Sequence, residues 1–156
     1  MQIDYIIIGA FSLILIGTAF YMGRSRMIAL IASTYIGILL YGSFPWVASL
    51  VPDASSALFA TGIGYGLLSI FIGLAYLAMA PAVWEGFGPG PYGEFFPAVL
   101  LGVGWGVLLL LVAHFQIPID SVYKLPTILN PVFSFTYASF WLLIPPLIAI
   151  FVASRR

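Results

Sequence analysis

The sequence has very few charged residues and no cysteine. Five basic and five acidic residues make up 6% of the 156 residues, and the formal net charge is zero. An ordinary soluble domain carries about a quarter charged residues, so this composition excludes a surface that faces water. The neutral charge also removes the basic patch that nucleic acid requires, and no nucleic-acid partner is expected. The absence of cysteine excludes disulfides, thiol catalysis, iron–sulfur clusters and thiolate zinc sites.

Long apolar runs fill most of the chain. Hydrophobic residues make up 63% of the sequence, and the mean hydropathy is +1.16. About twenty apolar residues cross the hydrocarbon core of a bilayer, and no segment alternates with the period of two that a barrel strand needs. We therefore predict an all-α polytopic membrane helix bundle, one transmembrane domain over residues 1–156, with five spans at about 3–22, 27–51, 57–83, 95–117 and 131–153.

Two pairs of arginines indicate the orientation. Arg24 and Arg26 follow the first predicted span, and Arg155 and Arg156 follow the fifth. Four crossings separate the pairs, which places both on one side of the membrane, and basic residues near span ends favour the cytoplasm. The prediction is an outside N-terminus and a cytoplasmic C-terminus in a multi-pass cell-membrane protein, with the bacterial inner membrane as the expected location.

The most distinctive motif is a glycine pentapeptide that occurs twice. Gly62-Ile63-Gly64-Tyr65-Gly66 and Gly102-Val103-Gly104-Trp105-Gly106 lie forty positions apart, each inside an apolar run. Glycines at four-residue spacing free one face of a membrane helix so that another backbone can approach. We predict helix-packing faces at the four outer glycines of the two motifs: Gly62, Gly66, Gly102 and Gly106.

Consecutive predicted spans are antiparallel, which places the two glycine motifs in opposite leaflets and gives each motif a different neighbour. The plain interpretation is that the glycines serve packing alone. A sharper one is an internal duplication with inverted topology, as in transporters, but the similarity covers only about ten residues.

Groups that carry chemistry are scarce within the spans. His114 is the one ionisable side chain inside an apolar run, and it falls in the last turns of the fourth span. A metal site needs further histidines or carboxylates at the same depth, and the Gly-x-Ser-x-Gly nucleophile motif is missing. We therefore expect no enzyme activity, no catalytic residue, no cofactor and no metal.

Proline marks two irregular places. Pro145 and Pro146 fall in the middle of the fifth span and predict a kink there, because neither can donate a backbone hydrogen bond. The segment 84–94 combines glycine, proline and aromatic residues. It is either a plain connector or a surface that docks on a partner.

Three features resemble the colicin V production family of bacterial inner-membrane proteins. They are Ile3-Asp4 at the start of the first span, the turn Gly23-Arg24-Ser25-Arg26, and the helix Leu101-Gly102-Val103-Gly104-Trp105-Gly106-Val107 after a proline-bearing loop. The extra apolar span and the lack of a polar C-terminal tail depart from the family pattern. The resemblance implies a role in envelope function or export, with no catalytic residues to transfer.

The preferred hypothesis is a non-enzymatic membrane protein that packs against other chains, either its own copies or a larger membrane assembly. The alternative is a small channel or transporter for an uncharged or lipid-like solute, built around the fifth span. Polar side chains that line one wet cavity would favour transport, and polar side chains that bond their own backbones would favour assembly. The side chains in question are Ser33, Thr34, Ser69, Ser134, Thr136 and Ser139.

Overall fold

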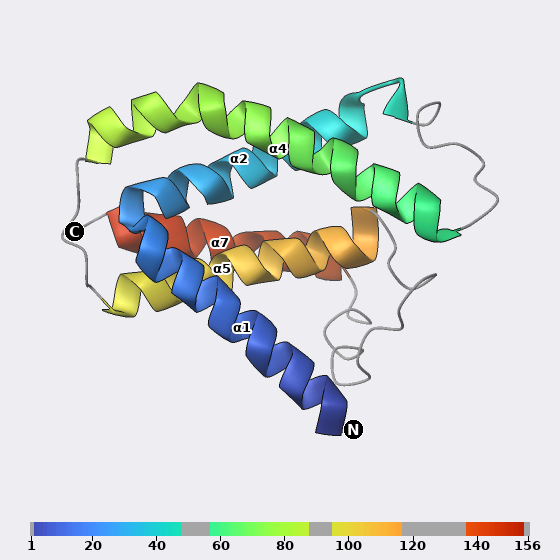
Figure 1. Ribbon diagram of the computed structural model, residues 1–156. Coiled ribbons are helices and arrows are strands. Elements are labelled where there is room, and N and C mark those ends of the chain that lie inside the picture. Colours follow the sequence, from blue (N-terminus) through green and yellow to red (C-terminus); the bar gives the residue numbers. More distant parts are fainter. Residues whose placement is uncertain (1, 48–56, 88–94, 117–136, 155–156) are drawn as a thin grey trace.

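The computed structural model describes residues 2–47, 57–87, 95–116 and 137–154. Every regular element in these ranges is a helix (Figure 1). Three stretches are long and apolar enough to cross a membrane: Arg24–Ser43, Leu58–Val83 and Phe96–His114. Two shorter apolar helices, Gly9–Met22 and Phe140–Ser154, accompany them. The composition thus leads to a helical bundle of the kind found in membranes.

The first two helices meet at a single glycine. Helix α1 runs over Gln2–Met22 and α2 over Arg24–Ser43. Gly23 joins them with φ 77° and ψ 169°, a backbone region that is open essentially to glycine alone. Arg24-Ser25-Arg26 is therefore the first turn of α2, and the connection is shorter than the turn that the sequence predicts.

Helix α2 ends earlier than predicted. It stops at Ser43 rather than near Val51, and Phe44 is extended, with φ −79° and ψ 113°. The residue before a proline is pushed out of the helical region by the proline ring, and Pro45 follows Phe44 directly. The early end of α2 therefore has a local cause, the proline at position 45.

The remaining helices follow the predicted spans more closely. Helix α4 covers Ala57–Phe87 and continues through Pro81 into the predicted connector. Helix α5 covers Phe95–Leu111 and passes into a π-helix, η1, at Val112–Gln116. Helix α7 covers Ala138–Ser154 and includes both Pro145 and Pro146. The part of the fifth span before residue 137 lies outside the described residues, as do residues 88–94 of the connector.

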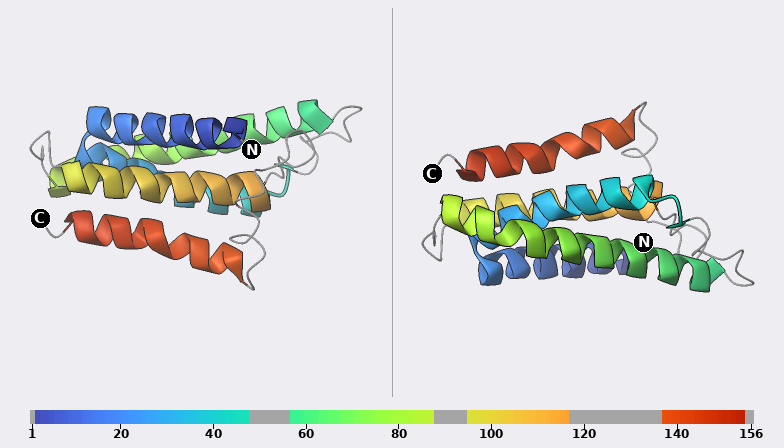
Figure 2. Two further views of the ribbon diagram at one scale, coloured as in Figure 1. Left: turned by 90° about the horizontal axis from the view of Figure 1, so that it is seen from below. Right: turned by 90° about the horizontal axis from the view of Figure 1, so that it is seen from above.

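The helices alternate in direction and surround α2 and α5 (Figures 1 and 2). Helix α4 packs mainly on α2, while α1 and α7 pack mainly on α5. The start of α2 and the end of α7 lie at the same end of the bundle (Figure 1). Helix α4 is thus a peripheral helix with one main neighbour.

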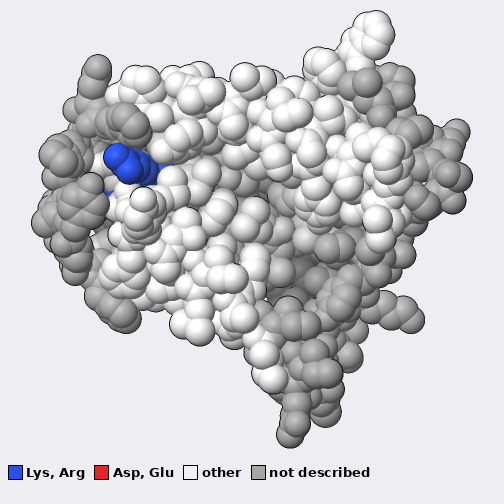
Figure 3. All heavy atoms as spheres, in the orientation of Figure 1, with Lys and Arg blue, Asp and Glu red and all other residues white. Residues whose placement is uncertain are grey.

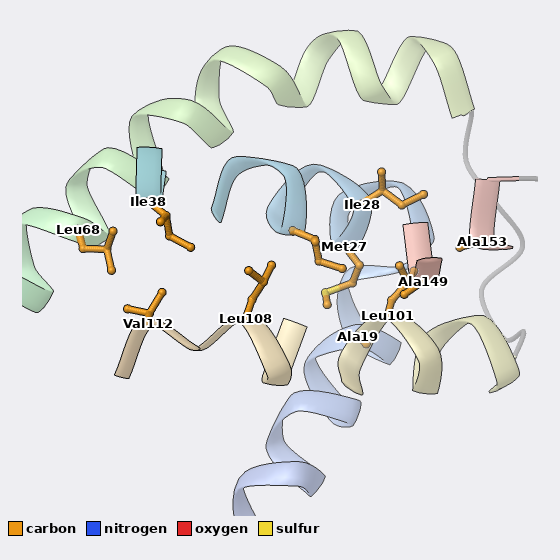
Figure 4. Packing of buried hydrophobic residues seen from close by; sticks show 11 residues of the cluster. Ala19, Met27, Ile28, Ile38, Leu68, Leu101, Leu108, Val112, Ala149 and Ala153 are labelled. Atoms are coloured by element: carbon orange, nitrogen blue, oxygen red, sulfur yellow. The ribbon is translucent and has the colours of Figure 1, made fainter. Parts of the chain in front are cut away.

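The core lies where these helices meet. Met27 and Ile31 of α2, together with Leu101 and Leu108 of α5, are fully buried. Side chains from every helix join the same cluster, which Figure 4 shows from close by. Ala19 of α1 and small residues of α7 complete it, so the interior combines branched side chains with small ones that allow close approach.

Candidate functional site

The second glycine motif lies against two helices of the same chain. A Cβ atom added to Gly102 would meet the Cα of Ile16 and the carbonyl oxygen of Leu15, each at 3.2 Å, and one added to Gly106 would meet Leu15 Cδ1 at 2.6 Å. Helix α1 therefore crosses α5 directly over these two glycines. The close approach of two backbones is the use that small residues have in membrane bundles.

Gly104, the middle residue of this motif, faces the opposite neighbour. Its added Cβ would lie 3.1 Å from Ala149 Cβ and 3.2 Å from Pro146 Cα. Pro146 is fully buried at this contact, whereas Pro145 is exposed. Helix α5 is thus packed tightly on both sides, against α1 through Gly102 and Gly106 and against α7 through Gly104.

The first glycine motif has different surroundings. Gly62 and Gly66 of α4 are exposed, and a Cβ added to either would meet nothing within 4 Å. Gly73, further along the same helix, is equally open. Together with the exposed Ser69, these glycines form the α4 stripe: Gly62, Gly66, Ser69 and Gly73. At about 100° per residue the four positions fall within roughly 60° of one another around the helix.

Helix α4 approaches α2 on a different face. On that face the close approach occurs at Gly37 of α2. A Cβ added to Gly37 would meet the backbone N and Cα of Ile72 at 3.0 and 3.1 Å. Large exposed hydrophobic side chains lie near the α4 stripe, among them Leu58, Phe59, Ile70, Leu74 and Leu77. The α4 stripe is therefore a shallow, small-residue strip within an apolar helix surface.

The starts of α4 and α5 lie at opposite ends of the bundle (Figure 1). The first motif falls in the first third of α4, whereas the second falls in the middle of α5. The atoms that face the second motif belong to α1 and α7, so the two motifs do not meet each other. Helix α1 packs on Gly102 and Gly106, and no described helix covers Gly62 and Gly66.

The described hydroxyl groups mostly bond to their own helices. Ser33 Oγ donates to the carbonyl of Ala29 at 2.6 Å, and Ser69 Oγ donates to that of Tyr65 at 2.7 Å. Thr34 Oγ1 donates to the carbonyl of Leu30 at 2.8 Å. Back-bonding of this kind is the usual way in which serine and threonine are satisfied inside a helix. Ser134 and Thr136 lie outside the described residues.

Trp105 and Tyr35 each make a hydrogen bond to another helix. The indole N–H of Trp105 in α5 donates to Thr34 Oγ1 in α2 at 3.3 Å. The hydroxyl of Tyr35 in α2 donates to the backbone carbonyl of Leu143 in α7. Tyr35 was not identified from the sequence as a contact between helices. A tyrosine within an apolar helix is the available signal, since its hydroxyl needs a partner when buried.

Ionisable groups are sparse in the part of the chain that the structure covers. His114 lies half-buried in η1, and the described residues contain no group of three His, Asp or Glu side chains suited to a metal ion. Arg24 and Arg26 are the described basic residues, and one basic patch is visible on the face shown in Figure 3. The remaining described atoms on that face are uncharged.

Comparison with known proteins identifies no family for this arrangement of helices. No protein-family model matches the chain, and no solved structure matches it. The functional argument therefore rests on the helices themselves, above all on the contrast between the covered glycines of α5 and the open glycines of α4.

Proposed function

We propose that the chain is a non-enzymatic integral membrane protein that acts as a subunit or accessory component of a membrane assembly. Its surface for the partner chain is the α4 stripe. The observation that carries the proposal is that the same glycine motif is covered by neighbouring helices on α5 and open on α4.

A membrane setting gives the open glycines their significance. Helices associate in lipid through close packing at small residues, because lipid tails are as apolar as leucine and provide no hydrophobic drive. In this chain Gly37, Gly102 and Gly104 each lie close to the backbone of another helix. A partner helix seated on the α4 stripe would gain the same close contact.

The proposal includes five spans, with the N-terminus outside and the C-terminus in the cytoplasm. In support, α1 and α7 are apolar, and both pack on α5, one of the three longer helices (Figure 2). The start of α2, with Arg24 and Arg26, lies at the same end of the bundle as the end of α7 (Figure 1). That arrangement agrees with the preference of basic residues for the cytoplasmic side.

The hydroxyl groups weigh in favour of assembly over a channel or transporter. Ser33, Thr34 and Ser69 all donate to carbonyls of their own helices. A serine or threonine hydroxyl has one donor, and in these three residues it is used within the helix, so it is not offered to a water-filled path. The proposed setting is the bacterial inner membrane, and a role in envelope function or export follows from the resemblance to the colicin V production family.

Single-cysteine variants test the proposal directly, because the native chain has no cysteine. Ser69→Cys places a near-isosteric thiol in the α4 stripe, and Ala78→Cys places one on an exposed face of α4. From Gly66, Ala78 is about 120° round the helix. After labelling with a photoactivatable maleimide in native membranes, Ser69→Cys is expected to cross-link to a protein chain, and Ala78→Cys to lipid.

Bulky substitutions supply the second arm of the experiment. Gly66→Leu is expected to abolish both the Ser69→Cys cross-link and co-purification of the partner in mild detergent, whereas Ala78→Leu preserves both. Mass spectrometry then identifies the partner as a second copy or another membrane protein. A monodisperse monomer with no protein cross-link at Ser69→Cys would refute the assembly proposal.

A further inference from the structure

Helix α7 carries two consecutive prolines in its middle. Pro145 and Pro146 have no backbone N–H, so the carbonyls of Trp141 and Leu142 lose the helical donor four residues later. The helix nevertheless runs without interruption from Ala138 to Ser154. Its central turn is therefore held by fewer backbone hydrogen bonds than the turns on either side.

The C-terminal half of α7 is anchored on α5. Pro146 and Ala149 lie directly over Gly104, with added-Cβ distances of 3.2 and 3.1 Å to Pro146 Cα and Ala149 Cβ. Ala149 and Ala153 are each 1% exposed and belong to the main core cluster. These small residues leave no room for this half to shift relative to α5.

The N-terminal half is held more lightly. Ala138 at the start of the helix is buried, but Phe140 and Trp141 are 59% and 55% exposed. Their rings stack edge to face on each other, with centroids 5.9 Å apart. The helix begins after Tyr137, which has a positive φ of 63°. Leu143 packs on the core cluster, and its carbonyl accepts the hydrogen bond from Tyr35 of α2.

We propose that α7 is a two-segment helix whose hinge is the Leu142–Pro146 turn, and that Tyr35 is the latch. The C-terminal segment stays on Gly104 of α5. The segment before the hinge, residues 138–141, swings away from α2 when the hydrogen bond from Tyr35 to the hinge residue Leu143 opens. A hinge needs a turn with missing backbone bonds, and a latch needs a contact across it from a fixed element. Both features meet within a few residues of α7.

The latch is a conformational device that is independent of the proposed assembly through α4, since it involves α2, α5 and α7 alone. The hydroxyl of Tyr35 is a single donor, and its removal leaves the aromatic ring and its packing in place. Tyr41 on the same helix offers a matched control. It too is partly buried against the core cluster, and the described residues hold no hydrogen bond to its hydroxyl.

Spin labels on the full chain in lipid nanodiscs test the hinge. One label is placed at Phe140→Cys in the N-terminal segment and one at Ile148→Cys in the C-terminal segment, both at exposed positions. In the Tyr35→Phe variant the mobile fraction at position 140 is expected to rise roughly three- to tenfold, the range that one interhelical hydrogen bond in a membrane supports. The label at position 148 and the Tyr41→Phe variant are expected to show no change.

Pro145→Ala adds a rescue arm, because Pro145 is exposed and its replacement restores a donor for the Trp141 carbonyl. In the Tyr35→Phe background it is expected to return the mobile fraction at position 140 toward the native value. Unchanged mobility at position 140, an equal rise at position 148, or failure of Pro145→Ala to rescue would each overturn the hinge.

Discussion

The indole N–H of Trp105 and the hydroxyl of Thr34 form a hydrogen bond between α5 and α2 at 3.3 Å. Thr34 Oγ1 itself donates a hydrogen bond to the carbonyl of Leu30 at 2.8 Å, so one hydroxyl serves as acceptor and donor. Thr34 is fully buried. The two central helices are thus connected by a polar contact within a largely apolar core.

Breaking this contact is expected to loosen the central pair of helices. Thr34→Val keeps the shape of the side chain and removes the acceptor, and Trp105→Phe removes the donor. Because interhelical hydrogen bonds in membranes contribute modestly, we expect a coupling free energy of about 0.5–1.5 kcal/mol in a double-mutant cycle. Reversible unfolding in mixed micelles measures it, and a coupling near zero would show that the contact does not form in the membrane.

Gly102→Ala and Gly66→Ala make a matched pair on the two glycine motifs. The first adds a methyl group 3.2 Å from the backbone of α1, which cannot yield as a flexible side chain would, and we expect a loss of about 1–3 kcal/mol. The second enters open space. It is expected to leave the isolated monomer unchanged or to stabilise it by up to about 1 kcal/mol, because alanine favours the helix over glycine.

Melting temperatures of the purified monomers in detergent compare the two variants. Gly106→Ala is expected to fall between them, because the atom in its way is the end of the flexible Leu15 side chain. An equal loss for Gly66→Ala and Gly102→Ala would contradict the different surroundings of the two motifs.

Gly37→Ala is expected to separate α4 from α2. The added methyl group would lie 3.0 Å from the backbone N of Ile72, and α4 has no other main neighbour. We expect a destabilisation of about 1–3 kcal/mol and weaker disulfide cross-linking between cysteines placed on α2 and α4. The exposed Gly42, where an added Cβ meets nothing within 4 Å, is the control on the same helix.

Gly23→Ala tests the connection between α1 and α2. With φ 77° and ψ 169°, an alanine at this position would be strained by about 1–3 kcal/mol. Lengthening the connection with an inserted glycine next to the alanine should restore the lost stability, because the chain could then turn without that conformation. Thermal unfolding of both variants in detergent provides the measurement, and full stability of Gly23→Ala alone would contradict the single-residue turn.

Much of the fold is visible in the sequence, because apolar helices in lipid satisfy their own backbone hydrogen bonds. The helical class is confirmed in the described residues. Three helices have the length and hydropathy of membrane spans. The end of α2 was misplaced because the apolar run continues past Ser43, while the pre-proline effect at Phe44 is local. The count of five spans and the orientation remain predictions.

The glycine motifs separate what the sequence determines from what only the tertiary structure decides. Near-identical sequence predicts a small-residue face on both α4 and α5, because glycine removes the side chain wherever it stands in a helix. Only the packing decides what occupies that space. Helix α1 lies over Gly102 and Gly106, α7 lies over Gly104, and no described helix lies over Gly62 and Gly66. Spacing along one helix is a local property, whereas the choice of neighbour depends on the directions and crossings of all the helices together.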